Sequence, residues 1–142
     1  MRINQTVILV ITIFFSALLS PIKADTNFFN KGVNFFLDEK FDKAKIEFEK
    51  DIVFNPKNEK SYLYLAKIFN KKDNLNLEEN NLNTVILLNP RNEEAIYDLT
   101  LLNIKKSNFE KSKELINTFK IVCKNLCLKK NELEIKLDSS LK

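Results

Sequence analysis

Apolar residues recur three or four positions apart along most of the chain after residue 25, as in Tyr62, Leu65, Ala66 and Phe69, which predicts amphipathic helices. The spacing places these helices near 26–38, 42–54, 59–71, 76–88, 93–105 and 109–122, with a seventh near 128–140. One Gly and three Pro are too few for the many tight turns of a β-sandwich or barrel. The pattern therefore predicts an all-α fold.

Polar residues at three of the predicted helix starts match known capping patterns. Asn58 and Asn92 follow two Asn-Pro turns and are predicted N-caps, because an Asn side chain can accept a hydrogen bond from the first turn of a helix. Ser107 precedes Glu110 by three residues, which is the spacing of a capping box. We therefore expect Ser107 to cap the helix near 109–122.

The chain also repeats itself with a period of 34 residues. The segment DIVFNPKNEK at 51–60 aligns with VILLNPRNEE at 85–94. Phe41, Leu75 and Phe109 have the same spacing and extend the period to a third unit. A period of this size is typical of stacked helical repeats, in which neighbouring hairpins share one continuous core. Each unit is therefore expected to form two helices.

In this register the chain resembles the tetratricopeptide repeat (TPR) family, whose pattern is W-x2-L-G-x2-Y, then A-x3-F, then P. In the first unit the matching residues are Phe28, Gly32, Phe35, Ala44, Phe48 and Pro56. In the second unit they are Tyr62, Leu65, Ala66, Phe69, Leu82 and Pro90, while Glu78 takes the Ala position. The third unit keeps Ile96 and Leu99 but departs from the pattern at Thr100, Asn103, Ser112, Ile116 and Lys124.

The resemblance implies a right-handed superhelix of about three helix-turn-helix TPR units, over 25–58, 59–92 and 93–124. Residues 125–142 would then form a C-terminal capping helix with a polar outer face. The apolar residues expected to dock this helix are Leu128, Leu133, Ile135 and Leu137.

The family's concave surface is lined chiefly by the first helix of each unit and commonly receives a peptide or a helix. The family's register places the following residues there: Phe29, Val33, Phe36, Leu63, Lys67, Asn70, Lys71, Tyr97, Leu101, Ile104 and Lys105. The resemblance thus implies a non-enzymatic interaction module that binds a protein or peptide in this groove, with its lysines favouring acidic segments.

The structural alternative is that the groove phenylalanines pack against their neighbours and that the groove lysines form a solvated face. Some TPR proteins hold the C-terminal carboxylate of chaperones with Lys and Asn from successive first helices. Phe29 and Val33 occupy the first Lys and Asn positions of that clamp in this sequence, so the clamp is not expected.

Residues 1–24 have the features of a signal peptide. Arg2 supplies a positive start, the run from Val7 to Leu19 is uncharged, and Ala24 precedes the expected cleavage point. The apolar run is shorter than the roughly 20 residues that span a bilayer. We therefore expect export, with a bacterial periplasm as the destination. The alternative is an uncleaved anchor at residues 3–20 that holds an assembly factor at the inner membrane.

Cys123 and Cys127 end the repeat region, and an oxidising compartment favours a disulfide between them. Residues four apart on a continuous helix have Cβ atoms about 5–6 Å apart, whereas a disulfide needs about 3.8 Å. A bridge therefore requires the helix to break at 124–126. Exported TPR proteins can end in a similar cysteine pair, which adds support. The alternatives are two reduced thiols or a thiol-disulfide enzyme.

Composition narrows the chemistry further. The chain has no His, which removes the commonest general base and metal ligand, and we predict no catalytic, cofactor or metal site. Without Arg2 and Lys23, the 23 basic residues fall to 21 against 19 acidic ones, a net charge of +2. Nucleic-acid binding is therefore not expected. The adjacent pairs Glu78-Glu79 and Glu93-Glu94 are predicted to be solvated, and the sequence leaves the oligomeric state open.

Overall fold

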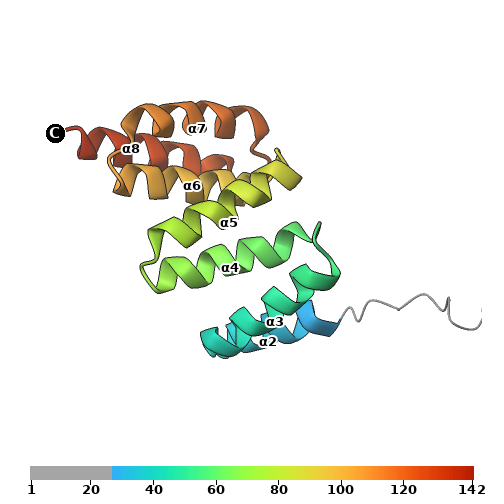
Figure 1. The fold of residues 1–142 in the computed structure, drawn as a ribbon. Helices are drawn as coiled ribbons and strands as arrows, with labels where there is room; N and C mark the ends of the chain where they lie inside the picture. The colour runs from blue at the N-terminus through green and yellow to red at the C-terminus, as the bar shows by residue number, and fades with distance from the viewer. Residues whose placement is uncertain (1–26) are drawn as a thin grey trace, which may run out of the picture.

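The computed structural model describes residues 27–142, so the predicted signal peptide lies outside the described residues. Within this range no strand is present, and the helices are α2 (Asn27–Leu37), α3 (Phe41–Phe54), α4 (Glu59–Lys71), α5 (Leu75–Leu88), α6 (Glu93–Lys105), α7 (Phe109–Val122), the 3-10 helix η1 (Cys127–Lys129) and α8 (Lys130–Ser140). They form antiparallel hairpins stacked from α2 and α3 at one end to α7 and α8 at the other (Figure 1). The all-α class is confirmed, and each predicted helix boundary is correct to within two residues. No helix of 27–142 has the length and apolar character that crossing a bilayer requires.

The turn inside each hairpin repeats with the period of the sequence. Glu39, Asp73 and Ser107 lie 34 residues apart in these turns and have positive φ angles of 59°, 54° and 59°. In the first turn the N–H of Lys40 bonds the carbonyl of Phe35, and the other two turns contain the equivalent bond. These bonds satisfy carbonyls at the end of each first helix. A left-handed residue that is not glycine thus closes each of the three hairpins α2–α3, α4–α5 and α6–α7.

The helix starts confirm two of the three predicted caps. The side chains of Asn58 and Asn92 each accept a backbone N–H from the first turn of their helix, and Asn74 does the same for α5. The prediction that Ser107 caps α7 is wrong, because Ser107 is the positive-φ residue that ends the preceding turn. Asn108 instead occupies the N-cap position, without a side-chain capping bond.

Gly32 allows α2 and α3 to approach closely. A Cβ atom at this position would lie 2.7 Å from Cε1 of Phe48, which is closer than carbon atoms pack. The Phe48 side chain is fully buried, and its ring stacks on that of Tyr64 with centroids 4.9 Å apart. The glycine of the TPR pattern therefore makes room for an aromatic ring that links the first and second hairpins.

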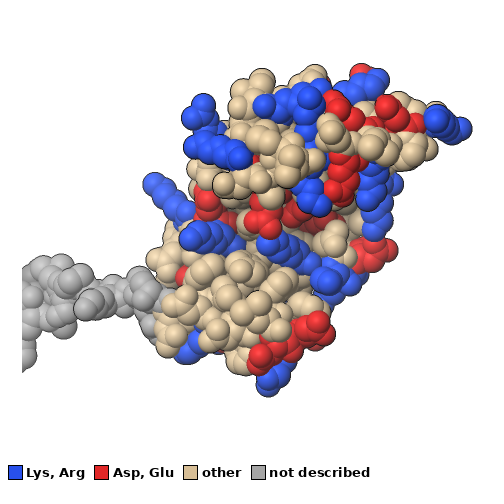
Figure 2. Space-filling model, turned by 180° about the vertical axis from the view of Figure 1, so that it is seen from behind, with Lys and Arg blue, Asp and Glu red and all other residues tan. Residues whose placement is uncertain are grey.

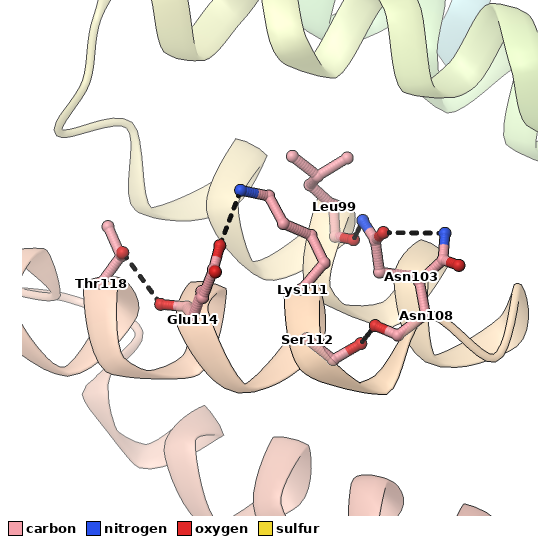
Figure 3. A network of polar contacts seen from close by, with 7 residues as sticks. All are labelled: Leu99, Asn103, Asn108, Lys111, Ser112, Glu114 and Thr118. Carbon is pink, nitrogen blue, oxygen red and sulfur yellow. Dashed lines mark hydrogen bonds and ion pairs between the residues drawn. The ribbon is translucent and has the colours of Figure 1, made fainter.

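The polar departures of the third unit are accommodated by hydrogen bonds (Figure 3). Asn103 is buried, and its Nδ2 donates to the carbonyl of Leu99 at 2.8 Å. Ser112 is also buried and donates to the carbonyl of Asn108 at 2.9 Å. Because buried polar groups that find a partner avoid most of the desolvation penalty, these two residues are compatible with a packed third hairpin.

The chain breaks its helix at the cysteine pair, as predicted. Helix α7 ends at Val122, and the structure joins Cys123 and Cys127 in a disulfide with Cα atoms 5.2 Å apart. The carboxylate of Glu93 accepts the backbone N–H groups of the intervening residues Lys124, Asn125 and Leu126 at 2.6, 3.0 and 3.1 Å. The interpretation of Glu93 as plain solvated surface is therefore wrong, because this side chain holds the turn between α7 and η1.

Only one face of α8 docks on the repeats. Leu133 and Leu137 are buried against α6 and α7. The expectation that Leu128 and Ile135 also dock is wrong, since their exposed fractions are 94% and 69%. Leu128 lies in η1, before α8 begins, and Ile135 lies two residues from both buried leucines, on the opposite side of the helix.

Candidate functional site

A cavity of about 780 Å³ opens along the first helices of the repeats. Most of its lining comes from α4 and α6, with two residues each from α5 and α8 and one each from α2, α7 and the turn before α7. The predicted groove residues that line it are Phe36, Lys67, Asn70, Lys71, Leu101, Ile104 and Lys105. The sequence register therefore brings residues of three hairpins to one hollow.

Two predicted groove residues from α2 lie apart from this cavity. The ring of Phe29 packs against Phe48 and Tyr64, with centroids 5.9 Å away in both cases. Val33 packs against the same aromatic cluster. Phe36 also contacts Tyr64, at 5.1 Å between centroids, but it lines the cavity as well. The alternative reading, in which the α2 phenylalanines pack on their neighbours, thus describes Phe29 well and Phe36 in part.

Leu63 and Tyr97 also lie outside the cavity lining. Leu63 is only 7% exposed and belongs to the core shared by α4 to α8, so it offers no open surface. The hydroxyl of Tyr97 donates to Glu132 at 2.7 Å, and its ring packs against Phe119. Because Glu132 is on α8, the terminal helix occupies the position in which Tyr97 was expected to meet a partner.

Lysines surround the cavity, and two of them are already paired. Lys67 forms an ion pair with Glu94 at 2.6 Å, and Lys105 forms one with Asp73 at 2.5 Å. Such pairs on the surface are individually weak, but they neutralise part of the expected cationic side. The lining lysines that form no ion pair within residues 27–142 are Lys71 and Lys136.

Glu78 is a buried acid in the floor of the cavity. It is 3% exposed, and its Oε1 accepts a hydrogen bond from Nδ2 of Asn70 at 2.9 Å. Its Oε2 is buried and has no hydrogen-bond partner among the described residues. Burial raises the pKa of this carboxyl, and the Asn70 bond opposes the rise. The prediction that Glu78 is solvated is wrong, because it occupies the Ala position of the repeat, on the inward face of α5.

Asp98 adds a second carboxyl to the same cavity. Burial, followed by repulsion from Glu94, raises its pKa to about 6, and Glu78 adds to the rise while Lys67 opposes it. Figure 2 shows the back of the molecule, where a hollow across the middle contains acidic side chains flanked by basic ones. The site therefore combines apolar walls, a lysine rim and an acidic floor. The sequence reasoning identified the first two and missed the floor.

This arrangement is suited to holding a charged, partly apolar chain segment. The lining contributes carboxylates, ammonium groups and the apolar side chains of Phe36, Leu82 and Leu101. Within 27–142, no three His, Cys, Asp or Glu side chains are grouped so that they could hold a metal ion.

Neither a protein-family model nor a curated protein matches this sequence. The structure, in contrast, is similar to solved TPR domains. The TPR2B domain of yeast Sti1, in complex with pHsp70, has a TM-score of 0.74 at 14% identity, over 80% of this chain and 94% of that one. The first TPR of Spaghetti (RPAP3), bound to the HSP90 peptide SRMEEVD, has a TM-score of 0.74 at 18% identity, over 84% and 98%.

A bacterial structure is similar as well. The Yersinia enterocolitica type III secretion chaperone SycD, in complex with a peptide of the translocator YopD, has a TM-score of 0.70 at 14% identity, over 86% of this chain and 94% of that one. At these identities the likeness establishes the fold. The expected TPR superhelix is confirmed.

Proposed function

We propose that this chain is a non-enzymatic interaction module that binds a segment of another protein in the concave cavity lined by α4, α5 and α6. The observation that carries the proposal is the cavity itself, which has a volume of about 780 Å³ and is lined by apolar and charged side chains from successive repeats. The Sti1 domain, the Spaghetti (RPAP3) domain and the chaperone SycD are each solved in a complex, the last two with a peptide, which supports the same use here.

Two kinds of contact would stabilise the complex, namely apolar burial and charge pairing. Phe36 and Leu101 are partly exposed in the cavity and would be buried by a partner, which supplies most of the affinity in such interfaces. Lys71 and Lys136 have no ion pair within residues 27–142 and are available to acidic groups of the partner, which favours fast and selective association. We therefore propose a partner segment that contains acidic residues.

We further propose that the protein is exported to a bacterial periplasm and meets its partner in the cell envelope. This proposal rests on the signal-peptide features of residues 1–24. Intact mass of the chain from its native cell tests it, because cleavage after Ala24 removes the whole segment. A retained segment would instead support the membrane-tethered alternative.

Site-specific photo-crosslinking tests the binding surface. A photoreactive phenylalanine replaces Ser140, an exposed residue of the cavity lining, or Ile121, which is 81% exposed on α7, in the full chain expressed in its native cell. We expect one protein to crosslink from position 140 and not from position 121. Equal capture from both positions, or none from position 140, would contradict the proposed function.

A further inference from the structure

Two carboxyls in the cavity floor lack an ion-pair partner among the described residues. Glu78 is only 3% exposed, and its Oε2 lacks a hydrogen-bond partner among the described residues. Asp98 comes from the adjacent helix α6, and within 27–142 its carboxylate forms neither an ion pair nor a side-chain hydrogen bond. A buried carboxylate that lacks a partner is destabilising, and such groups are common where a ligand supplies the missing contact.

The nearby lysines do not fill this role. Lys67 is paired with Glu94, and Lys105 is paired with Asp73 in the turn before α5. Both lysines act on the floor only through longer-range attraction, Lys67 on Asp98 and Lys105 on Glu78. Neither Glu78 nor Asp98 therefore has an ion-pair partner among residues 27–142, although lysines surround them.

Partly exposed apolar side chains accompany the two carboxyls. Phe36 and Leu101 line the same cavity and are partly exposed, whereas Ala66, Leu82 and Leu102 line it but are at most 2% exposed. The side chains of Lys and Arg combine an apolar stem with a charged end, and they bury the stem along apolar surface while the end reaches a polar partner. A cavity with apolar walls and an acidic floor is complementary to that shape.

We propose that the floor is a subsite for one basic side chain, Lys or Arg, of the protein segment bound in the groove, with Glu78 and Asp98 accepting its hydrogen bonds. The inference rests on the proposed function and refines it. The rim lysines Lys71 and Lys136 would then meet acidic residues on either side of the basic one. The groove therefore selects a segment of mixed charge rather than a purely acidic one.

A small-molecule probe tests the subsite directly in the full chain. The probe is n-butylguanidinium chloride, with n-butylammonium chloride as a second probe and the neutral isostere n-butylurea as the control. Binding is followed by NMR shifts of the backbone amides of α5 and α6. We expect saturable binding of at least one cationic probe and no saturable binding of n-butylurea. The cationic probe that binds more tightly shows whether the subsite prefers Arg or Lys.

Conservative variants locate the binding. Glu78→Gln retains an oxygen for the Asn70 bond and has the same volume, so this variant is expected to fold. We expect Glu78→Gln and Asp98→Asn each to weaken binding of the cationic probe at least tenfold. The control Glu110→Gln, on an exposed side chain of α7, should bind like the unmodified chain. Equal binding of n-butylurea, or unchanged affinity in both floor variants, would overturn the proposal.

Crosslinking to the native partner distinguishes a failure of this inference from a failure of the proposed function on which it rests. Crosslinking from position 140 should fall at least fivefold in the Glu78→Gln/Asp98→Asn double variant. Undiminished capture by that variant would overturn the basic subsite and leave the groove function intact. Absence of capture by the unmodified groove would instead contradict the proposed function.

Discussion

The carboxylate of Glu93 accepts the backbone N–H of Lys124 at 2.6 Å, thirty-one residues further along the chain. It also accepts the next two N–H groups, so the first residue of α6 fixes the turn that contains the disulfide. These donors favour the ionised carboxylate, and the bond from Lys124 is the main cause of the lowered pKa of Glu93. One side chain thereby links the third hairpin to the start of the terminal helix.

Replacing Glu93 should loosen this turn. Glu93→Gln offers one acceptor oxygen instead of two and turns an amide donor toward backbone donors, so we expect a loss of about 1–2 kcal/mol in the free energy of unfolding. Urea denaturation measures the change. Glu110→Gln, whose carboxylate only pairs with Lys113 on the surface, is the matched control. Equal stability of the two variants would contradict the role given to Glu93.

The pH dependence of stability should have opposite signs at two carboxyls. Because the pKa of Asp98 is raised to about 6, the folded state holds its proton more tightly than the unfolded state, and stability rises as the pH falls from 7 to about 5. The lowered pKa of Glu93 has the opposite effect, since its stabilising contribution is lost as the pH falls below the usual carboxyl range.

Asp98→Asn isolates the first of these effects. At pH 7 this variant should exceed the unmodified chain in free energy of unfolding by on the order of 1–3 kcal/mol, and the gain should shrink as the pH approaches 5. Chemical denaturation at a series of pH values provides the comparison. A gain of the same size at pH 5 and pH 7 would show that the charge of Asp98 is not responsible.

The contact between Gly32 and Phe48 predicts that even one added methyl is harmful. Gly32→Ala would place a Cβ 2.7 Å from a ring that is fully buried. We expect a loss of about 1–3 kcal/mol from overpacking, although Ala is the better helix former by about 1 kcal/mol. Adding Phe48→Leu should relieve the clash, so the two losses should not add. Additive losses in this double-mutant cycle would rule out the contact as the cause.

At a turn residue with positive φ, replacement by glycine should stabilise the fold. Glu39 has φ 59°, a conformation that costs roughly 1–2 kcal/mol for a residue with a Cβ. Glu39→Gly should therefore stabilise the first hairpin by about 0.5–1 kcal/mol, after allowance for the greater freedom of Gly in the unfolded chain. Thermal denaturation measures the gain, and Glu39→Ala, which keeps the Cβ, should show none.

The features that were predictable from the sequence are those set by local pattern. The apolar spacing and the repeated Asn-Pro turns fix the helices and their caps, since Asn58 and Asn92 act on backbone only a few residues away. The burial of Glu78 was not predictable in this way. It follows from packing against α4, and its sequence signal is an acid at a position where the repeat pattern has Ala.

The same limit applies to the terminal helix. The contact of Tyr97 with Glu132 joins residues 35 positions apart, and it forms because the turn after α7 directs α8 back over α6. No local pattern specifies that direction. The sequence therefore identified the groove and its lysines, while its acidic floor and the region covered by α8 emerged only from the tertiary structure.

The central claim is that the hollow lined by α4, α5 and α6 binds a protein segment. The most direct test measures how tightly the crosslinked partner binds two charge-reversal variants. Lys71→Glu changes the rim of the cavity, and Lys57→Glu changes an exposed lysine in the turn before α4. With both variants folded, we predict that the dissociation constant is at least fivefold larger for Lys71→Glu and unchanged for Lys57→Glu. Equal affinities would contradict the account.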